Sequence, residues 1–426
     1  MSPTTPQEAG TAPFVLLGAG FSKAISSLMP TLAELRPRVL DRLNVDPTEL
    51  IPYGNDLEQW LSFLSVDQPW LTDIENLSNR VMFMRASAAV SECIREIEQE
   101  ALEAPLPNWL SRLVASWCAD SATLVTFNYD VLVERALTAM GLVAEWADVY
   151  RVPLISRQLG ASAGLSFGVM NPPGPTLELL KLHGSTNWGY GGLHAPSSEV
   201  MCLLRSGQGW SPETKADDSP RNKGMFDDLQ PMIVPPTGTK NAFYSNAGLR
   251  AQWRNAAASL ARASEVTIFG YSFPATDLAT RQFFSRSLPS VPITVVDRST
   301  RVADTVEEIS TGHTSLNRFT GNNAVEDYVN ANCGDLVRWG TDYISGANVP
   351  WVEVNGQKRH RRCSGEAQDA QTAAGVLAVE EIPTLELNRG DSSRDSSKTH
   401  WAPRPLAYRH KYDPRTERGS ACAGDF

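Results

Sequence analysis

Five short apolar runs recur along the chain, and each one stops at small or polar residues. Their apolar positions are nearly continuous rather than alternating, which is typical of strands buried on both faces of a parallel sheet. A sixth run, PMIVPP at 231–236, is a weaker strand candidate. The five runs are 14–22 (FVLLGAGFS), 123–130 (TLVTFNYD), 177–185 (LELLKLHGS), 265–273 (EVTIFGYSF) and 293–299 (ITVVDRS).

Helical patterns fill the intervals between these runs, most clearly at 56–103 and 248–263. Strands that alternate with helices predict an α/β fold, here a Rossmann-like parallel sheet with helices on both faces. The long helical stretch, about 30–112, is expected to be an insertion after the first strand. Residues of about 186–230 are rich in Gly, Ser and Pro, and we expect a second, irregular insertion there.

The composition changes toward the C-terminus. We expect a flexible N-terminus at 1–12, one main domain at 13–345, and a polar tail at 346–426 that is disordered or loosely attached. From residue 355 onward there are 12 Lys and Arg against 10 Asp and Glu, which leaves 26 basic and 38 acidic residues before it. An acidic body argues against direct nucleic-acid binding as the main activity.

The composition as a whole is that of an ordinary soluble globular protein, with 42% hydrophobic residues, 20% charged residues and a net charge of -10 over 426 residues. The six cysteines include no C-x-x-C pair, so neither a zinc ribbon nor a thioredoxin-type site is indicated. The N-terminus does not read as a signal peptide, and no apolar run approaches the roughly 20 residues of a membrane span. We therefore expect a cytoplasmic protein with no membrane contact.

Polar or glycine-rich residues end all five apolar runs. The endings are Gly-Ala-Gly-Phe-Ser, Phe-Asn-Tyr-Asp, His-Gly-Ser, Gly-Tyr-Ser and Asp-Arg-Ser. In an open parallel sheet, ligands bind outside the carboxyl ends of the strands, where the strand order switches. If the strands are parallel, these endings gather along one edge and predict a functional site there.

The first two endings allow more than one interpretation. Gly18 and Gly20 could form a phosphate-binding turn before a helix, but Lys23 replaces the third glycine of the dinucleotide fingerprint, and a plain strand-to-helix turn explains them equally well. Asn128 can orient a water or a carboxamide through its donor and acceptor atoms. Asp130 could act beside it or could simply cap the following helix.

The remaining endings contain a histidine, a serine and an aspartate. His183 suits general-base work because the pKa of histidine lies near neutrality, although a lone histidine is often structural. Gly270 and Ser272 again read either as a ligand-binding turn or as a capped turn. Asp297 could accept hydrogen bonds from a ribose hydroxyl or cap the next turn.

Taken in order, these motifs resemble the SIR2 (sirtuin-like) family over about residues 13–300. The set is Gly-Ala-Gly-x-Ser, Asn-x-Asp, His-Gly, Gly-x-Ser and a final acidic strand end. Two stretches, 29–35 (MPTLAEL) and 56–71 (DLEQWLSFLSVDQPWL), further resemble the bacterial SIR2-like proteins of anti-phage defence. The resemblance implies an NAD-binding fold in which the glycosidic bond to nicotinamide is broken, with NAD+ as substrate and no metal.

The resemblance also implies roles for individual residues. Asn128, Asp130 and His183 would be catalytic, beside and on the nicotinamide ribose. The residues implied to bind the cofactor are Gly18, Ala19, Gly20, Phe21 and Ser22 near the phosphates and adjoining ribose, and Gly270, Ser272 and Asp297 in the adenosine half.

Two departures from the family's deacylases bear on the reaction. Those enzymes carry two C-x-x-C pairs after the His-Gly motif, whereas here only Cys202 lies between His183 and Gly270. Their Pro-Asp-Phe-Arg loop is replaced by FSKAISSLMPTLAEL. Both departures favour NAD hydrolysis to nicotinamide and ADP-ribose over deacylation, and the expected role is that of an NAD-depleting effector of antiviral defence by abortive infection.

Several alternatives stay open. The chain could be a zinc-free NAD-dependent protein deacylase or an ADP-ribosyltransferase. It could also be a sensor that binds NAD or ADP-ribose without turnover, or an interaction protein with an eroded pocket. For an NAD-depleting enzyme we expect a homo-oligomer, controlled by self-assembly, by the tail, or by a separate sensor or activator protein.

Overall fold

The computed structural model describes residues 12–143, 146–150, 152, 154–156, 177–191, 201–204, 209–212, 229–238, 240, 243–274, 277–310, 315–334, 336–344, 347–354 and 357–360. All of them belong to one compact unit, residues 1–366. A second unit, residues 367–426, lies outside the described residues, and so do residues 1–11 of the predicted flexible N-terminus, 1–12.

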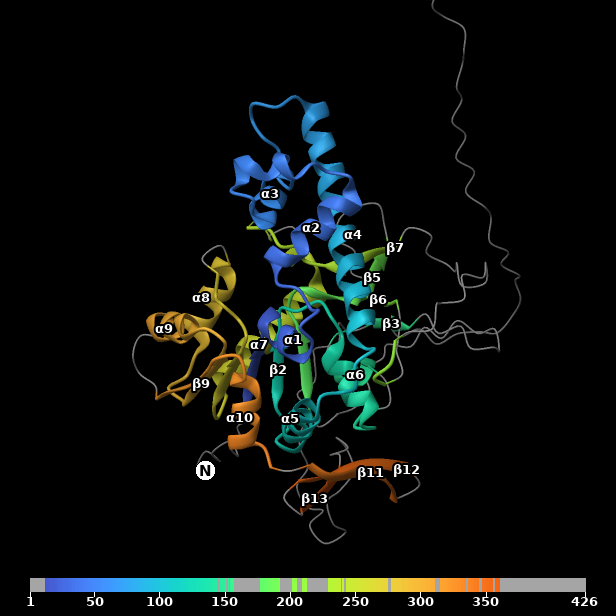
Figure 1. Ribbon diagram of the computed structural model, residues 1–426, viewed down its shortest axis with the longest axis vertical. Coiled ribbons are helices and arrows are strands. Elements are labelled where there is room, and N and C mark those ends of the chain that lie inside the picture. Colours follow the sequence, from blue (N-terminus) through green and yellow to red (C-terminus); the bar gives the residue numbers. More distant parts are fainter. Residues whose placement is uncertain are drawn as a thin grey trace, which may run out of the picture. The chain divides into compact units, whose positions relative to one another are not determined.

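A six-stranded parallel sheet forms the centre of this unit (Figure 1). Each pair of neighbouring strands is parallel, so the predicted Rossmann-like sheet is confirmed. The strand order reverses at the first strand, from which the chain builds the sheet in both directions. In spatial order the strands are β10 (Leu316–Thr320), β9 (Ile293–Asp297), β8 (Val266–Phe269), β1 (Phe14–Leu17), β2 (Thr123–Thr126) and β4 (Glu178–Lys181).

Helices cover both faces of this sheet. Successive residues of β1 point to opposite faces, so Val15 and Leu17 join one apolar cluster while Phe14 and Leu16 join another. Burial on both faces explains why the strands read as continuous apolar runs. The first cluster includes residues of α1 (Ala19–Ile25), α5 (Asn108–Ala119), α6 (Leu132–Ala139) and α10 (Ala324–Asn332), and the second includes residues of α7 (Ala247–Ala261), α8 (Leu278–Ser287) and α9 (Thr300–Ile309).

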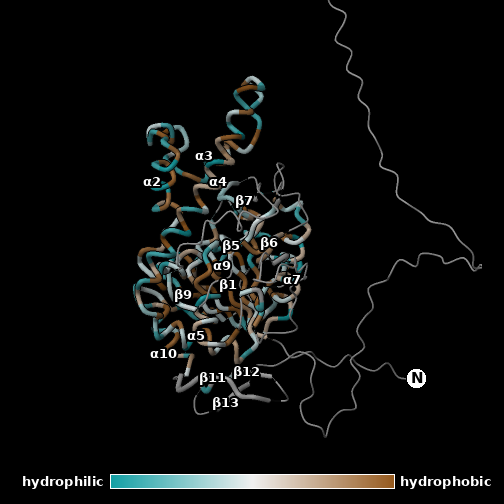
Figure 2. The backbone as a smooth tube through the Cα atoms, turned by 90° about the vertical axis from the view of Figure 1, so that its right-hand side faces the viewer, coloured by the Kyte–Doolittle hydropathy of each residue, from teal (hydrophilic) through white to brown (hydrophobic). Residues whose placement is uncertain are grey.

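The insertion after the first strand is helical, as predicted. It contains α2 (Leu32–Leu43), η1 (Pro47–Tyr53), α3 (Leu57–Leu64) and α4 (Asp73–Ala101), and α2 and α3 pack along α4. Thr72 and Glu75 form a capping box that starts α4. Hydrophilic and hydrophobic segments alternate along these helices in Figure 2, as amphipathic packing requires. No helix in the described part of the chain, α4 included, is long and apolar enough to cross a membrane.

Part of the predicted second insertion, about 186–230, lies in strands, and much of the rest lies outside the described residues. A second sheet has the order β3 (Leu154–Ser156), β6 (Met201–Leu203), β5 (Gly184–Gly191) and β7 (Leu229–Ile233). Trp188 and Tyr190, two residues apart on β5, are both buried, and so is Gly189 between them, so burial does not alternate along this part of the strand.

Strand pairing also reaches into the segment that was predicted as a tail, 346–426. β11 (Leu336–Ile344), β12 (Ala347–Val354) and β13 (Gln357–His360) form an antiparallel sheet, so strand pairing continues past residue 345. Ahead of this sheet, the Arg112 guanidinium on α5 donates to the carbonyls of Cys333 and Gly334 at 2.8 and 3.2 Å. The rest of the predicted tail, from residue 361, lies outside the described residues.

Candidate functional site

The turns that follow β1 and β8 touch through their backbones. The N–H of Gly18 donates to the Phe269 carbonyl, and the N–H of Gly20 donates to the Gly270 carbonyl, both at 2.9 Å. A Cβ on Gly18 would overlap the Gly270 carbonyl, and one on Gly20 would lie 2.8 Å from the Gly270 Cα. Gly270 itself has a φ of +58°, and a Cβ there would overlap the Phe21 amide. Packing between the two turns therefore requires all three glycines.

The glycine-rich turn is thus explained by contacts within the chain. Its predicted role at the phosphates of a dinucleotide stays a prediction. Ala19 is exposed at this edge, whereas Phe21 is 1% exposed. The ring of Phe21 packs against Trp109 and Trp117, with centroids 6.0 and 5.8 Å away. The structure therefore places Phe21 in the core, where only its backbone is near the turn.

Three of the predicted site residues meet at the ends of β1 and β2. The Nδ2 of Asn128 donates to the Ser22 hydroxyl at 2.9 Å and to the Gly18 carbonyl at 2.8 Å. The Ser22 hydroxyl donates in turn to Oδ2 of Asp130 at 2.6 Å. The parallel register of β1 and β2 brings these segments side by side, as the gathering of strand ends predicts.

Asp130 is a buried carboxylate with an altered acidity. Burial raises the pKa of Asp130 to about 6, against the opposing charge of Lys181 and the hydrogen bond from Ser22. Its Oδ1 also accepts a hydrogen bond from the Leu132 amide at 3.3 Å, at the start of α6. The contact with Leu132 fits the capping interpretation, while the predicted catalytic role of Asp130 stays a prediction.

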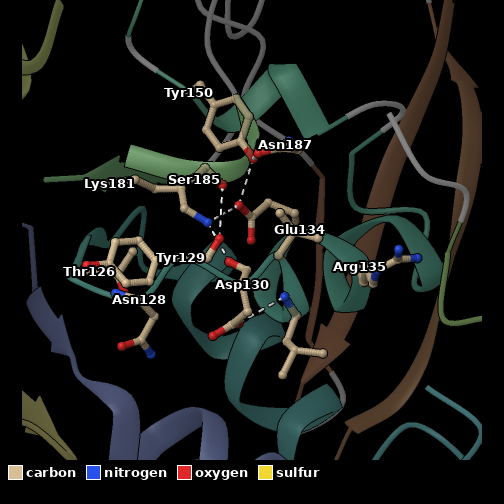
Figure 3. A network of polar contacts seen from close by, with 12 residues as sticks. Thr126, Asn128, Tyr129, Asp130, Glu134, Arg135, Tyr150, Lys181, Ser185 and Asn187 are labelled. Atoms are coloured by element: carbon tan, nitrogen blue, oxygen red, sulfur yellow. Dashed lines mark hydrogen bonds and ion pairs between the residues drawn. The ribbon is translucent and has the colours of Figure 1, made fainter. Parts of the chain in front are cut away.

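A network of buried polar groups lies behind Asp130 (Figure 3). The Lys181 ammonium donates to the Asp130 carbonyl at 2.5 Å and to Glu134 Oε1 at 2.9 Å. The Tyr150 hydroxyl also donates to Glu134 Oε1, at 2.7 Å, and Asn187 donates to that hydroxyl at 3.0 Å. The side chains of Lys181 and Glu134 are each only 1% exposed, so each charge depends on its partner.

The network extends to the helical insertion through Glu98 of α4. Glu98 accepts a hydrogen bond from the Val131 amide at 3.0 Å and pairs with the Arg135 guanidinium at 3.2 Å. The Arg135 guanidinium also lies over the Trp146 ring, 4.9 Å from its centroid. We call Glu98, Asp130, Glu134, Arg135, Lys181, Tyr150 and Asn187 the buried network.

Sequence reasoning missed most of the buried network, although one signal was present. Lys181 stands inside the apolar run LELLKLHG, and a lysine in a doubly buried strand needs a charged or hydrogen-bonded partner. The run alone does not tell which partner, because Glu134 and Asp130 meet Lys181 only through the fold.

His183 follows β4 at the same edge of the sheet and is 6% exposed. Its ring packs on Phe127, with centroids 4.8 Å apart, and its Nε2 lies 3.4 Å from the Tyr244 hydroxyl. Phe127 immediately precedes Asn128, so the ring of His183 packs beside the turn that carries Asn128. Within the described residues, no hydrogen bond joins His183 directly to Asn128 or Asp130.

The surroundings of His183 favour the neutral imidazole. Burial lowers the pKa of His183 well below its ordinary value, and repulsion by Lys240 lowers it further, while Asp277 acts in the opposite direction. Lys240 and Asp277 pair at 3.3 Å, and the Tyr271 hydroxyl donates to Asp277 at 2.9 Å. At neutral pH the ring is therefore neutral and has a low affinity for a proton, and Asp277 is the carboxylate that opposes this effect.

The remaining predicted residues do not join this cluster. Ser272 is exposed after β8. Asp297 ends β9, where its Oδ1 accepts a hydrogen bond from the Ser299 amide at 2.7 Å, and burial raises its pKa. The turn-capping interpretation accounts for Asp297, and the predicted role of both residues toward adenosine stays a prediction. In the described part of the chain, no group of three or more His, Cys, Asp or Glu side chains is placed to hold a metal ion.

Comparisons with known proteins return structural neighbours only. No protein-family model and no curated protein sequence matches the chain. One similar structure, from work on the mechanism and regulation of Sir2 enzymes, has 14% identity and a TM-score of 0.32, covering 75% of this chain and 90% of its own. Another is Sir2 with the inhibitor EX-527, 2′-O-acetyl-ADP-ribose and a deacetylated p53 peptide, at 15% identity and a TM-score of 0.31, covering 75% and 91%. Likeness at this level is not evidence of a shared activity.

Proposed function

We propose that the chain is an NAD+ hydrolase that releases nicotinamide and ADP-ribose. One observation carries the proposal. At the carboxyl edge of a parallel sheet, the buried, neutral His183 packs on Phe127, next to the turn that holds Asn128 and Asp130. This edge is where open α/β sheets bind their ligands. The motif order described above supplies the substrate class.

The proposed reaction begins with departure of nicotinamide. The electron pair of the bond between the ribose C1′ and the nicotinamide nitrogen leaves with nicotinamide, and the ribose acquires oxocarbenium character. Asp130, with a pKa of about 6, is mostly ionised at neutral pH and places negative charge behind the turn. Asn128 is held by Ser22 and Gly18, so its carboxamide is fixed in one orientation that can position a water molecule.

Water then completes the reaction at C1′. The water oxygen forms the new bond to C1′, and its proton passes to His183 and on to solvent. The neutral imidazole has a low proton affinity, but the attacking water becomes strongly acidic as it bonds to C1′, so the ring can take this proton, and Asp277 stabilises the cation that forms. The finer part of the proposal, an NAD-depleting effector of anti-phage defence, rests on the sequence stretches 29–35 and 56–71 alone.

The test is chromatography of NAD+ incubated with the purified full chain. We expect nicotinamide and ADP-ribose in equal amounts from the wild type. His183→Ala should lower the rate by about a hundredfold or more, because a positioned general base typically contributes at least that much. Asn128→Ala should lower it by about a hundredfold, because misplacement of a reacting group can cost that much. Asn317→Ala, at an exposed position of β10, is the matched control and should leave the rate unchanged.

Two further measurements separate the alternatives. An acylated lysine peptide added to the same assay reports deacylation, and 2′-O-acyl-ADP-ribose in place of ADP-ribose would contradict hydrolysis as the main reaction. If no turnover occurs, calorimetric titration with NAD+ decides. Binding without turnover would indicate a sensor or a silenced enzyme, and absence of binding would refute the site.

A further inference from the structure

A surface groove of about 510 Å³ lies between α7 and α8. Arg250, Trp253 and Arg254 line it from α7, and Phe283 and Arg286 line it from α8. We call it the arginine groove. Its volume falls in the range of small-molecule sites, about 300–1,000 Å³.

The groove carries three positive charges that make no ion pair with a described side chain. Arg250, Arg254 and Arg286 are exposed, and none makes an ion pair or a side-chain hydrogen bond with the described residues. Among the described residues that line the groove there is no Asp or Glu. Arg250 and Arg254 stand four residues apart, so they share one face of α7 and repel each other unless an anion lies between them.

These three arginines lie together although the protein as a whole is acidic. Some exposed arginines, such as Arg42, Arg80 and Arg318, pair with carboxylates of the chain, whereas others, such as Arg95 and Arg262, make no ion pair with the described residues. What distinguishes the groove is that three arginines of the second kind line it. The residues before 355 carry 38 acidic against 26 basic side chains, so acidic partners are in excess. The arginine groove is thus a local cationic site rather than part of a basic surface.

Aromatic rings form the floor of the groove. Trp253 and Phe283 meet edge to face, with centroids 5.5 Å apart and planes at 88°. Tyr244, which also lines the groove, meets Trp253 at 5.4 Å and 73°. Aromatic side chains that line a groove can stack on a planar ligand, as they do on nucleobases.

We infer that the arginine groove binds a nucleotide that carries two or more phosphates. Guanidinium groups bind phosphate oxygens through paired hydrogen bonds, and three of them match a polyphosphate better than a single carboxylate. The aromatic floor accounts for a base, which an acidic peptide would lack.

The groove is connected to the candidate site through its floor. The Tyr244 hydroxyl lies 3.4 Å from His183 Nε2, and the Trp253 ring lies 6.5 Å from the His183 ring. A nucleotide in the groove therefore touches the rings that pack against His183. An effect of that nucleotide on catalysis rests on the proposed function, whereas its binding does not.

The test is isothermal titration calorimetry of the full chain with ATP at low ionic strength. We expect wild-type binding, and a loss of affinity of about tenfold or more in the double variant Arg254→Ala/Arg286→Ala, because hydrogen bonds to charged groups are the stronger kind. Arg262→Ala is the matched control, because Arg262 is exposed at the end of α7 and lies outside the groove. The ATP affinity of this variant should stay within about twofold of the wild-type affinity.

Two further measurements test where ATP binds and whether its base contributes to binding. Asn128→Ala should keep ATP affinity unchanged, because Asn128 belongs to the sheet edge and not to the groove. Tripolyphosphate should bind more weakly than ATP, since it lacks a base.

The inference is overturned if ATP does not bind at millimolar concentration, or if Arg262→Ala loses as much ATP affinity as the double variant. It is also overturned by loss in Asn128→Ala alone, by equal affinity for tripolyphosphate, or by tighter binding of a hexaglutamate peptide. Because ATP binding is read without NAD turnover, its failure and that of the proposed function are distinguishable.

Discussion

Ion pairs with similar geometry occur in two regions of this protein. In the buried network and on the helical insertion alike, nitrogen and oxygen atoms approach to 2.6–3.2 Å. The side chains differ in exposure, at most 1% in the network against 34–58% on the insertion. The pairs compared are Lys181–Glu134 and Arg135–Glu98 in the network, and Arg42–Glu92 and Arg80–Asp67 on the insertion.

The comparison shows that the distance between the charged atoms does not by itself determine how much an ion pair contributes to stability. An exposed pair is screened by water and salt, and the loss of one partner leaves the other solvated. A buried pair has lost its hydration, so the loss of one partner leaves an uncompensated charge in a medium of low dielectric constant. The buried network therefore fixes the turn of Asn128 and Asp130, whereas the pairs on the insertion add little to its stability.

The largest expected effect comes from breaking a buried pair. Lys181→Met removes the partner of Glu134 and the donor to the Asp130 carbonyl, and should lower the free energy of unfolding by about 3–5 kcal/mol. Urea denaturation followed by circular dichroism measures it. The double variant Lys181→Met/Glu134→Leu removes both charges and should regain part of the loss. A change below about 1 kcal/mol in the single variant would contradict the importance of burial.

The pH dependence of Asp130 sharpens the same comparison. Its pKa is about 6 in the folded chain against 3.8 as the ordinary value, so between pH 4 and 6 the folded state binds more protons than the unfolded state. The free energy of unfolding should therefore fall as the pH rises through this window, by about 3 kcal/mol in total from this group. Asp130→Asn should flatten the slope in denaturation curves at pH 4, 5 and 6. If the slope is unchanged in this variant, the pH dependence of the free energy of unfolding comes from groups other than Asp130.

The smallest expected effect belongs to an exposed pair of the insertion. Arg80→Ala removes the pair with Asp67, and should change the free energy of unfolding by less than about 1 kcal/mol. The same urea experiment measures it, with added salt as a control that should leave the difference small. A loss as large as that of Lys181→Met would mean that exposure does not divide the two regions.

Within the six-stranded sheet, the sequence predicted five strands and missed β10, which lies at the edge. β1 and β8 are fully buried and read as continuous apolar runs. β10 lies at the edge of the sheet with exposed Asn317, Arg318 and Thr320, so its residues LNRFT carry no such signal. Its pairing with β9 depends on the position of a neighbour, which local sequence does not record.

The same division holds for the candidate site. Ser22, Asn128 and Asp130 were predicted because they end strands, and parallel strand ends must meet. Lys240 and Tyr244 were missed because they lie in and beside the short η3 (Phe243–Ser245) and reach His183 only through tertiary packing. Chemistry at strand ends can be read from sequence, whereas partners from connecting segments cannot.

The contact between the turns of β1 and β8 limits how this chain can vary in evolution. Gly18, Gly20 and Gly270 touch through backbone atoms, so a side chain gained at one position cannot be accommodated by shortening another. The two turns are distant in sequence, but a change in one is therefore tolerated only if the other still fits it. Grafting either turn into another scaffold transfers its shape only if the facing turn is transferred with it.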